Sequence, residues 1–279
     1  MKYLGVDVGS VSTDIAVIDE KGNLVVGLYL RTGGDPIRAV KDGFSKIKAQ
    51  FGDELEIEGV GVTGSARFLV GAVVGADVIK NEITAHATAG LHYNSDIQTI
   101  IEIGGQDSKI IIIRDGIVVD FAMNSVCAAG TGSFLDHQAQ RLGISIEDFG
   151  DIALRSTNPV RIAGRCTVFA ESDMIHKQQL GHRQEDILFG LCEALVRNYL
   201  SNVGRGKEIR PPILFQGGVA ANKGIKVALE RALGVEIIIP PYFSLMGAIG
   251  AALLAQEYGI KRTRFKGFET ADQNITTRG

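Results

Sequence analysis

Residues 99–105 read Thr99-Ile100-Ile101-Glu102-Ile103-Gly104-Gly105, the pattern of a buried β-strand that ends in an acidic residue and a glycine turn. A second apolar run follows at 107–113, then a turn at 114–116 and a returning run at 117–119. The start of the chain has the same order, because Leu4-Gly5-Val6-Asp7-Val8 leads into Gly9-Ser10 and then into a hairpin. An acid, a glycine turn and a hairpin that occur twice predict two related halves. Chance repetition is the alternative, since strand–glycine–strand patterns are common in α/β chains.

Helical and extended patterns alternate along the rest of the chain, which predicts an α/β protein. Within the last helical pattern, small residues such as Gly247, Ala248 and Gly250 permit close packing. We predict one domain from 1–94 plus 242–279 and a second from 95–241. The expected helices are 36–50, 81–91, 185–201, 221–233 and 244–258, and the further strands are 59–63, 213–215 and 235–239.

The composition limits the function classes. The chain has 279 residues, which is enough for two modest domains, and a net charge of −3, which gives no sign of nucleic acid or an anionic membrane as a partner. Apolar runs fall short of the ~18 residues that span a bilayer, and the first strand leaves no room for a signal peptide. Three cysteines without scaffold spacing indicate a reducing cytoplasm. The basic segment from Lys261 is expected to be a solvated tail, with a docking surface for an acidic partner as the alternative.

Two cysteines stand before helix-like patterns. Cys127 precedes the glycine-rich run 128–132, and Cys166 precedes an apolar run at 168–175. Helix starts carry partial positive charge and free N–H groups, which suit an anionic centre. A buried, inert thiol is the alternative for any single cysteine.

Three glycine turns follow predicted strands, at Gly9-Ser10, Gly104-Gly105 and Gly217-Gly218. Such turns supply backbone N–H donors for a nucleoside triphosphate, although a plain β-turn is the alternative for each one alone. Asp7 and Glu102 add negative charge, which suits phosphate only when a cation such as Mg²⁺ intervenes. The sequence has no P-loop motif, and no Rossmann glycine motif follows the first strand.

The ordered set Gly5-Val6-Asp7-Val8-Gly9-Ser10, Ile103-Gly104-Gly105-Gln106-Asp107 and Gly217-Gly218-Val219-Ala220 resembles the nucleotide motifs of the acetate kinase/actin/Hsp70/sugar kinase superfamily. The runs Cys127–Gly132 and Cys166–Ser172 resemble the two signatures of ATP-dependent activators of 2-hydroxyacyl-CoA dehydratases. That family of BadF/BcrA-type ATPases includes ATPase subunits of benzoyl-CoA reductases and reductases of double-cubane cluster proteins. The resemblance covers about residues 3–256 and implies a duplicated actin-like ATPase (ribonuclease H-like) fold, with two domains and a nucleotide cleft between them.

The resemblance also implies a function and its residues. It implies an ATP-hydrolysing homodimer that holds one [4Fe-4S] cluster between subunits, through Cys127 and Cys166 of each chain, and passes an electron to a partner iron–sulfur enzyme. Ferredoxin or flavodoxin would be the electron donor, and Asp7 would hold Mg²⁺ through water. The implied catalytic residues are Asp7, Glu102 and Asp107, and the implied nucleotide-binding residues are Gly9, Ser10, Ser12, Thr13, Gly104, Gly105, Gln106, Gly130, Thr131, Gly132, Gly217, Gly218, Val219 and Asn222.

The sequence departs from the family pattern in places, and two alternative functions stay open. Family members often carry Asp where Glu102 stands and Lys where Asp14 stands, while Cys192 matches no family ligand and is expected in the core. A small-molecule kinase of the same superfamily, without a cluster, is the first alternative. A non-enzymatic actin-like scaffold that uses ATP to polymerise is the second.

Overall fold

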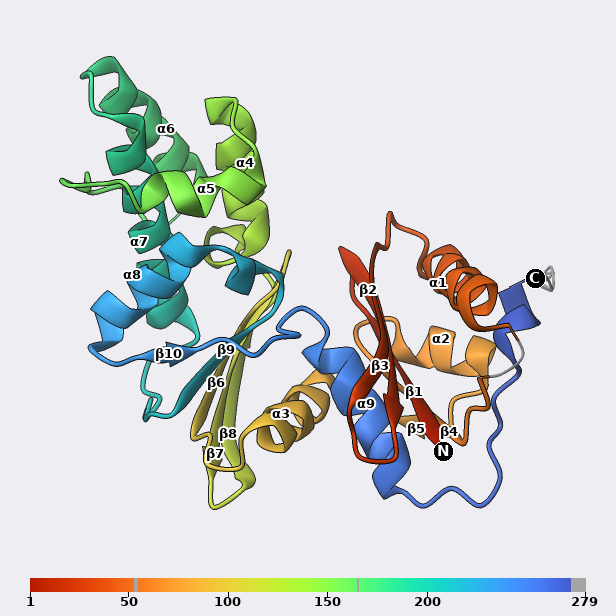
Figure 1. Ribbon diagram of the computed structural model, residues 1–279. Coiled ribbons are helices and arrows are strands. Elements are labelled where there is room, and N and C mark those ends of the chain that lie inside the picture. The colour runs from red at the N-terminus through yellow and green to blue at the C-terminus, as the bar shows by residue number, and fades with distance from the viewer. Residues whose placement is uncertain (53–54, 165, 272–279) are drawn as a thin grey trace. The chain divides into compact units, whose positions relative to one another are not determined.

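The computed structural model describes residues 1–52, 55–164 and 166–271. The chain divides into two compact units, Met1–Tyr93 with Ser244–Gly279 and Asn94–Phe243, which are called unit 1 and unit 2 below. Each unit contains one five-stranded mixed sheet with helices packed on it (Figure 1).

Unit 1 has the strand order β3-β2-β1-β4-β5, in which β1 pairs antiparallel with β2 and parallel with β4. Figure 1 shows α1 and α2 on one side of this sheet and α9 on the other. The elements are β1 (Lys2–Val8), β2 (Ser12–Asp19), β3 (Leu24–Arg31), α1 (Pro36–Phe51), β4 (Gly59–Thr63), α2 (Arg67–Val74), β5 (Val78–Ile79), α3 (Glu82–Tyr93), α9 (Met246–Glu257) and the 3₁₀ turn η3 (Phe268–Ala271).

Unit 2 has the strand order β10-β9-β6-β7-β8, in which β6 pairs antiparallel with β7 and parallel with β9. Apolar side chains of the sheet and of α4–α8 form its core. The elements are β6 (Thr99–Ile103), β7 (Ser108–Arg114), β8 (Ile117–Asn124), the 3₁₀ turn η1 (Ala128–Gly130), α4 (Gly132–Leu142), α5 (Ile146–Ala153), α6 (Thr167–Gln179), α7 (Gln184–Asn202), β9 (Ile213–Gln216), the 3₁₀ turn η2 (Gly218–Ala221), α8 (Lys223–Leu233) and β10 (Ile237–Ile238).

The two sheets have the same connectivity. In each unit, three consecutive antiparallel strands form a meander, and the first of these strands pairs in parallel with a later strand, which pairs in parallel with the last. Glu102 and Asp7 occupy equivalent places, because each is the second-last residue of the first strand of its unit. The prediction of two related α/β halves is therefore confirmed, and chance repetition does not explain it.

Close packing of α9 organises unit 1. A methyl group placed on Gly5 of β1 would lie 1.9 Å from the Ala248 carbonyl oxygen, and one on Gly61 of β4 would lie 1.9 Å from that of Ala251. The backbones of helix and strands therefore meet directly, with no side chain between them. The predicted close packing of the small residues in this helix is confirmed, because the approach leaves no room for a Cβ atom at Gly5 or Gly61.

The basic C-terminal segment is not a solvated tail over residues 263–268. Phe265 and Phe268 pack edge-to-face on Phe44 of α1, with ring centroids 5.9 and 5.3 Å away. Asp77 accepts hydrogen bonds from the Thr263 hydroxyl (2.7 Å) and the Arg264 amide (2.8 Å). The expectation was wrong because it weighed the charges of the segment and not its two phenylalanines, whose burial offsets the entropy lost on ordering.

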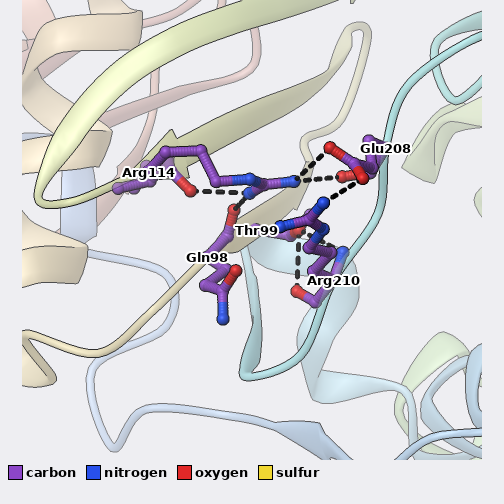
Figure 2. Close-up of polar contacts among 6 residues, drawn as sticks. Gln98, Thr99, Arg114, Glu208 and Arg210 are labelled. Atoms are coloured by element: carbon purple, nitrogen blue, oxygen red, sulfur yellow. Dashed lines mark hydrogen bonds and ion pairs between the residues drawn. The ribbon is translucent and has the colours of Figure 1, made fainter.

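One polar network fastens the α7–β9 connection to the end of the unit 2 sheet (Figure 2). Arg114 donates from Nη1 to the Gln98 carbonyl oxygen (3.0 Å) and from Nη2 to the Glu208 carbonyl oxygen (2.7 Å). The Thr99 hydroxyl donates to the Arg210 carbonyl oxygen (3.0 Å) and accepts from the Arg210 amide (3.1 Å). This network lies where β6 begins, whereas the glycine turn lies where β6 ends.

Within the described residues, the helices are too short or too polar to cross a membrane.

Candidate functional site

Three glycine turns meet in unit 2 where parallel strands β6 and β9 end. The Gly132 and Ser133 amides, at the start of α4, donate to the carbonyl oxygens of Gly104 and Gly105, each at 2.8 Å. Gly217 has φ 89°, and a methyl group there would lie 2.5 Å from the Ile103 carbonyl oxygen, so only glycine fits. Segments far apart in sequence thus form one cradle of backbone groups. Of the predicted nucleotide-binding residues, it holds Gly104, Gly105, Gln106, Gly130, Thr131, Gly132, Gly217, Gly218, Val219 and Asn222 on its turns or the elements next to them.

A buried lysine neutralises the two carboxylates beside this cradle. Lys109 Nζ lies 3.0 Å from Glu102 Oε2 and 2.7 Å from Asp107 Oδ2. Lys109 is 2% exposed and Glu102 4% exposed, while the Asp107 side chain reaches solvent. The sequence analysis invoked an external cation to balance Glu102, and the structure supplies an internal one. The signal was available, because the hairpin register places Lys109 directly opposite Glu102.

Unit 1 has a corresponding turn after β1. The Gly9 amide donates to the Ser12 carbonyl oxygen (2.8 Å), which closes the turn that contains Ser10. The buried Thr13 hydroxyl is hydrogen-bonded to that of Thr32 (2.9 Å), and the Ser12 hydroxyl donates to Asp14 (3.3 Å). Both hydroxyls therefore have partners within unit 1, and the predicted roles of Gly9, Ser10, Ser12 and Thr13 in nucleotide binding stay predictions.

Asp7 lies at the start of α9. A methyl group on Gly247 would lie 1.9 Å from Asp7 Oδ2, so the carboxylate touches the first turn of this helix. The N-terminus of a helix carries partial positive charge, which stabilises a carboxylate there. Thr63, the last residue of the neighbouring parallel strand β4, is in register with Asp7. The sequence pattern indicated Asp7, but it did not indicate that the N-terminus of α9 stabilises the Asp7 carboxylate.

Asn124 fixes the backbone of Cys127. Its Oδ1 accepts hydrogen bonds from the amides of Cys127 (3.0 Å) and Val126 (3.2 Å), and its Nδ2 donates to the Cys127 carbonyl oxygen (2.8 Å). Asparagine forms such local turns readily. Cys127 thereby directly precedes η1 and its thiol is partly exposed. The sequence pattern did not indicate this role of Asn124.

The segment that leads to Cys166 lies along α7. Arg197 Nη2 donates to the Ile162 carbonyl oxygen (2.7 Å), and Asn198 Nδ2 donates to that of Gly164 (2.7 Å). A methyl group on Gly164 would lie 2.8 Å from the Ala194 carbonyl oxygen, so the segment touches the helix backbone. Cys166 itself is the N-cap of α6, and its thiol is partly exposed. Both cysteines therefore lie at helix starts in the structure.

The helices that follow the two cysteines are joined to each other. Arg141 of α4 donates from Nε to Glu171 Oε1 of α6 (2.7 Å), and its Nη2 lies 2.5 Å from the same oxygen. His137 Nδ1 lies 3.5 Å from Glu171 Oε2. Glu171 belongs to the second cysteine signature, so one carboxylate of that signature ties α6 to α4.

Cys192 is fully buried within α7, as the sequence predicted, and burial raises the pKa of its thiol far above the usual range. It is therefore a neutral core residue. Across residues 1–52, 55–164 and 166–271, no group of three or more His, Cys, Asp or Glu side chains lies together as a metal site. The described part of one chain thus offers two partly exposed thiols, those of Cys127 and Cys166.

Asp186 provides a test of the segment before Cys166. Its carboxylate accepts from the Ser156 hydroxyl (2.7 Å) and the Asn158 amide (3.0 Å), and these hydrogen bonds, that of Ser156 first, lower its pKa. Because the folded-state pKa is depressed, this stabilisation is present above about pH 4 and is lost as pH falls through the folded value. We expect Asp186→Asn to lose about 1–2 kcal/mol at pH 7 and less at pH 3, measured by urea unfolding.

Asp151→Asn is the matched control, because Asp151 forms an exposed ion pair with Lys223 and should contribute little. A deficit in Asp186→Asn that is the same at pH 7 and pH 3 would show that the carboxylate charge is not what holds the segment.

Comparison with known proteins identifies the fold class. The chain is similar to the solved activator of the 2-hydroxyisocaproyl-CoA dehydratase from Clostridium difficile with bound ADPNP, with a TM-score of 0.83 and 33% identity over 92% of this chain and 95% of that one. It shares the fold alone with a ROK family glucokinase from Streptomyces griseus, at a TM-score of 0.56 and 14% identity over 92% of this chain and 100% of that one. The protein is thus an ATPase of the duplicated actin-like class, as the sequence predicted.

Sequence relatives narrow the class to a family. The (R)-2-hydroxyglutaryl-CoA dehydratase activating ATPase of Acidaminococcus fermentans is 32% identical over 261 residues, which cover 92% of this chain and 98% of that protein. An uncharacterized protein of Methanocaldococcus jannaschii is 31% identical over 94% of this chain, which spans only 64% of that longer protein. The model of the BadF/BadG/BcrA/BcrD ATPase family matches residues 4–255. The chain belongs to this family of ATPases, whose relatives include activators of 2-hydroxyacyl-CoA dehydratases.

Proposed function

We propose that this protein hydrolyses ATP to deliver a single low-potential electron to a partner iron–sulfur enzyme of the 2-hydroxyacyl-CoA dehydratase type. The observation that carries the proposal is that unit 2 contains both a glycine cradle and two partly exposed cysteines. The glycine cradle with its Glu102–Lys109–Asp107 group and two partly exposed cysteines at helix starts belong to one compact unit. A small-molecule kinase would need the cradle but not the paired thiols.

The cradle is suited to phosphate. Backbone amides at glycine turns approach phosphate oxygens without interference from a side chain. Ser108 Oγ and Asn222 Nδ2, next to these turns, are buried and have no hydrogen-bond partner within the described part of the chain. Buried polar groups normally have partners, so water or a ligand belongs at these two atoms. Asp107, held by Lys109 and open to solvent, is the carboxylate placed to orient an attacking water.

The thiols fit a [4Fe-4S] cluster that is shared between two copies of the chain. Such a cluster takes four thiolates, and each chain offers Cys127 and Cys166. A two-fold dimer would supply the other pair. Exposed apolar side chains flank both cysteines, since Val126 is 95% exposed, Val168 67% and Phe169 66%. A second copy would bury these side chains, which favours association at the cysteines.

When bound, the cluster would accept one electron and release it to the partner. The chain contributes the positions of the thiols, through Asn124 at Cys127 and through the α7 contacts before Cys166. The partner would be a dehydratase, a benzoyl-CoA reductase or a double-cubane cluster protein, and ferredoxin or flavodoxin would return the electron. In unit 1, Asp7 would hold Mg²⁺ through water.

Iron content tests the proposal. Anaerobically purified wild type should contain about four irons per dimer, with a visible absorption that dithionite bleaches. Cys127→Ala and Cys166→Ala should each lose the iron, because each removes two of the four ligands of a dimer. Cys192→Ala, which alters only a buried thiol, should keep it. Colourless, iron-free wild type after anaerobic reconstitution would overturn the electron-transfer function and leave an ATPase without a cluster.

A further inference from the structure

One residue of α7 contacts both cysteine-bearing segments. Asn198 is 5% exposed, and its Nδ2 donates to the Gly164 carbonyl oxygen (2.7 Å), two residues before Cys166. A methyl group on Gly130 would lie 2.8 Å from Asn198 Oδ1, so the other end of the same carboxamide touches the turn that follows Cys127. The side chain is itself held, because Asn202 Nδ2 donates to that Oδ1 (2.9 Å).

We propose that Asn198 is a positioning residue that sets the separation of Cys127 and Cys166 by fixing both segments to one point on α7. A buried carboxamide can do this because it is planar, so the nitrogen that donates to Gly164 and the oxygen that touches Gly130 keep a fixed separation. The backbone between Gly130 and Cys127 is short and is further fixed by Asn124. Movement of Asn198 would therefore change the position of one cysteine relative to the other. The inference rests on the proposed function for its purpose, but not for its geometry.

The neighbouring residue connects the same turn of α7 to the nucleotide cradle. The Tyr199 hydroxyl donates to the Lys109 carbonyl oxygen (2.8 Å), and burial raises its pKa well above the usual value, so it remains a neutral donor. The backbone of Tyr199 also lies near Gly130. Tyr199→Phe removes one buried hydrogen bond from the same helical turn without removing a contact that Asn198 makes to a cysteine segment. It is therefore the matched control for loss of one hydrogen bond in this place.

Amide hydrogen exchange tests the positioning role without requiring a bound cluster. In iron-free wild type and variants, exchange would be followed by mass spectrometry in peptides from 123–131 and 160–164. We expect Asn198→Ala to speed exchange in both segments, and by about fivefold in 160–164, where it removes one buried hydrogen bond. Tyr199→Phe should leave 160–164 at the wild-type rate. Unchanged exchange in either segment of Asn198→Ala would overturn the proposal.

A second variant approaches the same residue from the opposite side. Gly130→Ala introduces a methyl group against Asn198 Oδ1, and we expect it to speed exchange in 160–164, which contains no residue it touches. Gly130→Ala should speed exchange in 160–164 less in an Asn198→Ser background than in the wild-type background. The shorter serine side chain leaves room for the added methyl group. If Asn198→Ala does not fold, the test rests on these two variants. An exchange rate in 160–164 that Gly130→Ala leaves unchanged would then overturn the proposal.

Iron retention separates this inference from the proposed function. Residues that orient metal ligands typically change metal affinity about 10–100-fold when replaced, so Asn198→Ala should lose reconstituted iron to a chelator about tenfold faster than Tyr199→Phe. Coupled exchange in a wild type that never binds iron would leave the positioning role intact and overturn the proposed function. Iron bound equally tightly by all variants, with uncoupled exchange, would overturn the positioning role alone.

Discussion

Replacing Lys109 with methionine is expected to destabilise unit 2 by about 3–5 kcal/mol. The change removes the ammonium that lies 3.0 Å from the buried Glu102 carboxylate and 2.7 Å from that of Asp107. Removing one partner of a buried ion pair leaves the other charge uncompensated, and this costs much more than the pair contributes when intact. Methionine fills most of the same volume, so the loss would report on charge and not on packing. Urea unfolding monitored by circular dichroism measures it.

Glu102→Gln is the companion variant, and its effect should be smaller. Lys109 would keep Asp107 as a charged partner, so no isolated charge is left buried. The double variant Glu102→Gln/Lys109→Met should then be more stable than Lys109→Met alone, because Glu102→Gln removes the buried carboxylate charge that Lys109 balances in the wild type. A Lys109→Met variant that loses less than about 1 kcal/mol, or a double variant whose losses simply add, would show that Glu102 does not depend on Lys109.

This pair also shows how far the sequence can be interpreted. The repeat of acid, glycine turn and hairpin predicted both sheets, because strand periodicity and glycine turns are local signals. Lys109 was within reach of the same reasoning, since a hairpin of known register places it opposite Glu102. A lysine at the start of the apolar run Ile110–Ile113 is unusual enough to mark a buried charge.

Other parts of the site were beyond local reasoning. The hydrogen bond from Asn198 to Gly164 depends on how an irregular segment lies along α7, which neither residue signals by itself. The first turn of α9 reaches Asp7 from the far end of the chain. Short helices such as α2 and α5 have too few turns for a clear period, and they were not predicted. Contacts between segments distant in sequence are set by packing, and packing leaves little trace in any one segment.

The α7 helix connects the glycine cradle of unit 2 with its two cysteine segments. One of its turns contacts the Lys109 backbone through Tyr199 and both cysteine segments through Asn198. A change at the glycine cradle that moved β7 would therefore act on the same helical turn that contacts the cysteine segments. Coupling of this kind needs a demonstrated two-state element, which is why exchange in the two segments should be compared with and without ATP.

Replacing Gly250 with alanine sets helix propensity against packing, and packing should prevail by a wide margin. In the interior of a helix, alanine is normally more stable than glycine by about 0.5–1 kcal/mol. A methyl group on Gly250 of α9, however, would lie 1.8 Å from the Ala85 carbonyl oxygen of α3. Backbone cannot rotate away as a side chain can, so the two helices would have to separate. We expect a net loss of 3 kcal/mol or more in the stability of unit 1, at the upper end of overpacking effects.

Gly181→Ala is the matched control for this variant. Gly181 has φ 77°, and no atom lies within 4 Å of a methyl group placed there, so the substitution introduces strain without a clash. It should cost about 1 kcal/mol. Urea unfolding of both variants, with fluorescence of the tyrosines, measures the difference between clash and strain. A Gly250→Ala variant as stable as wild type would mean that α3 and α9 do not pack backbone to backbone.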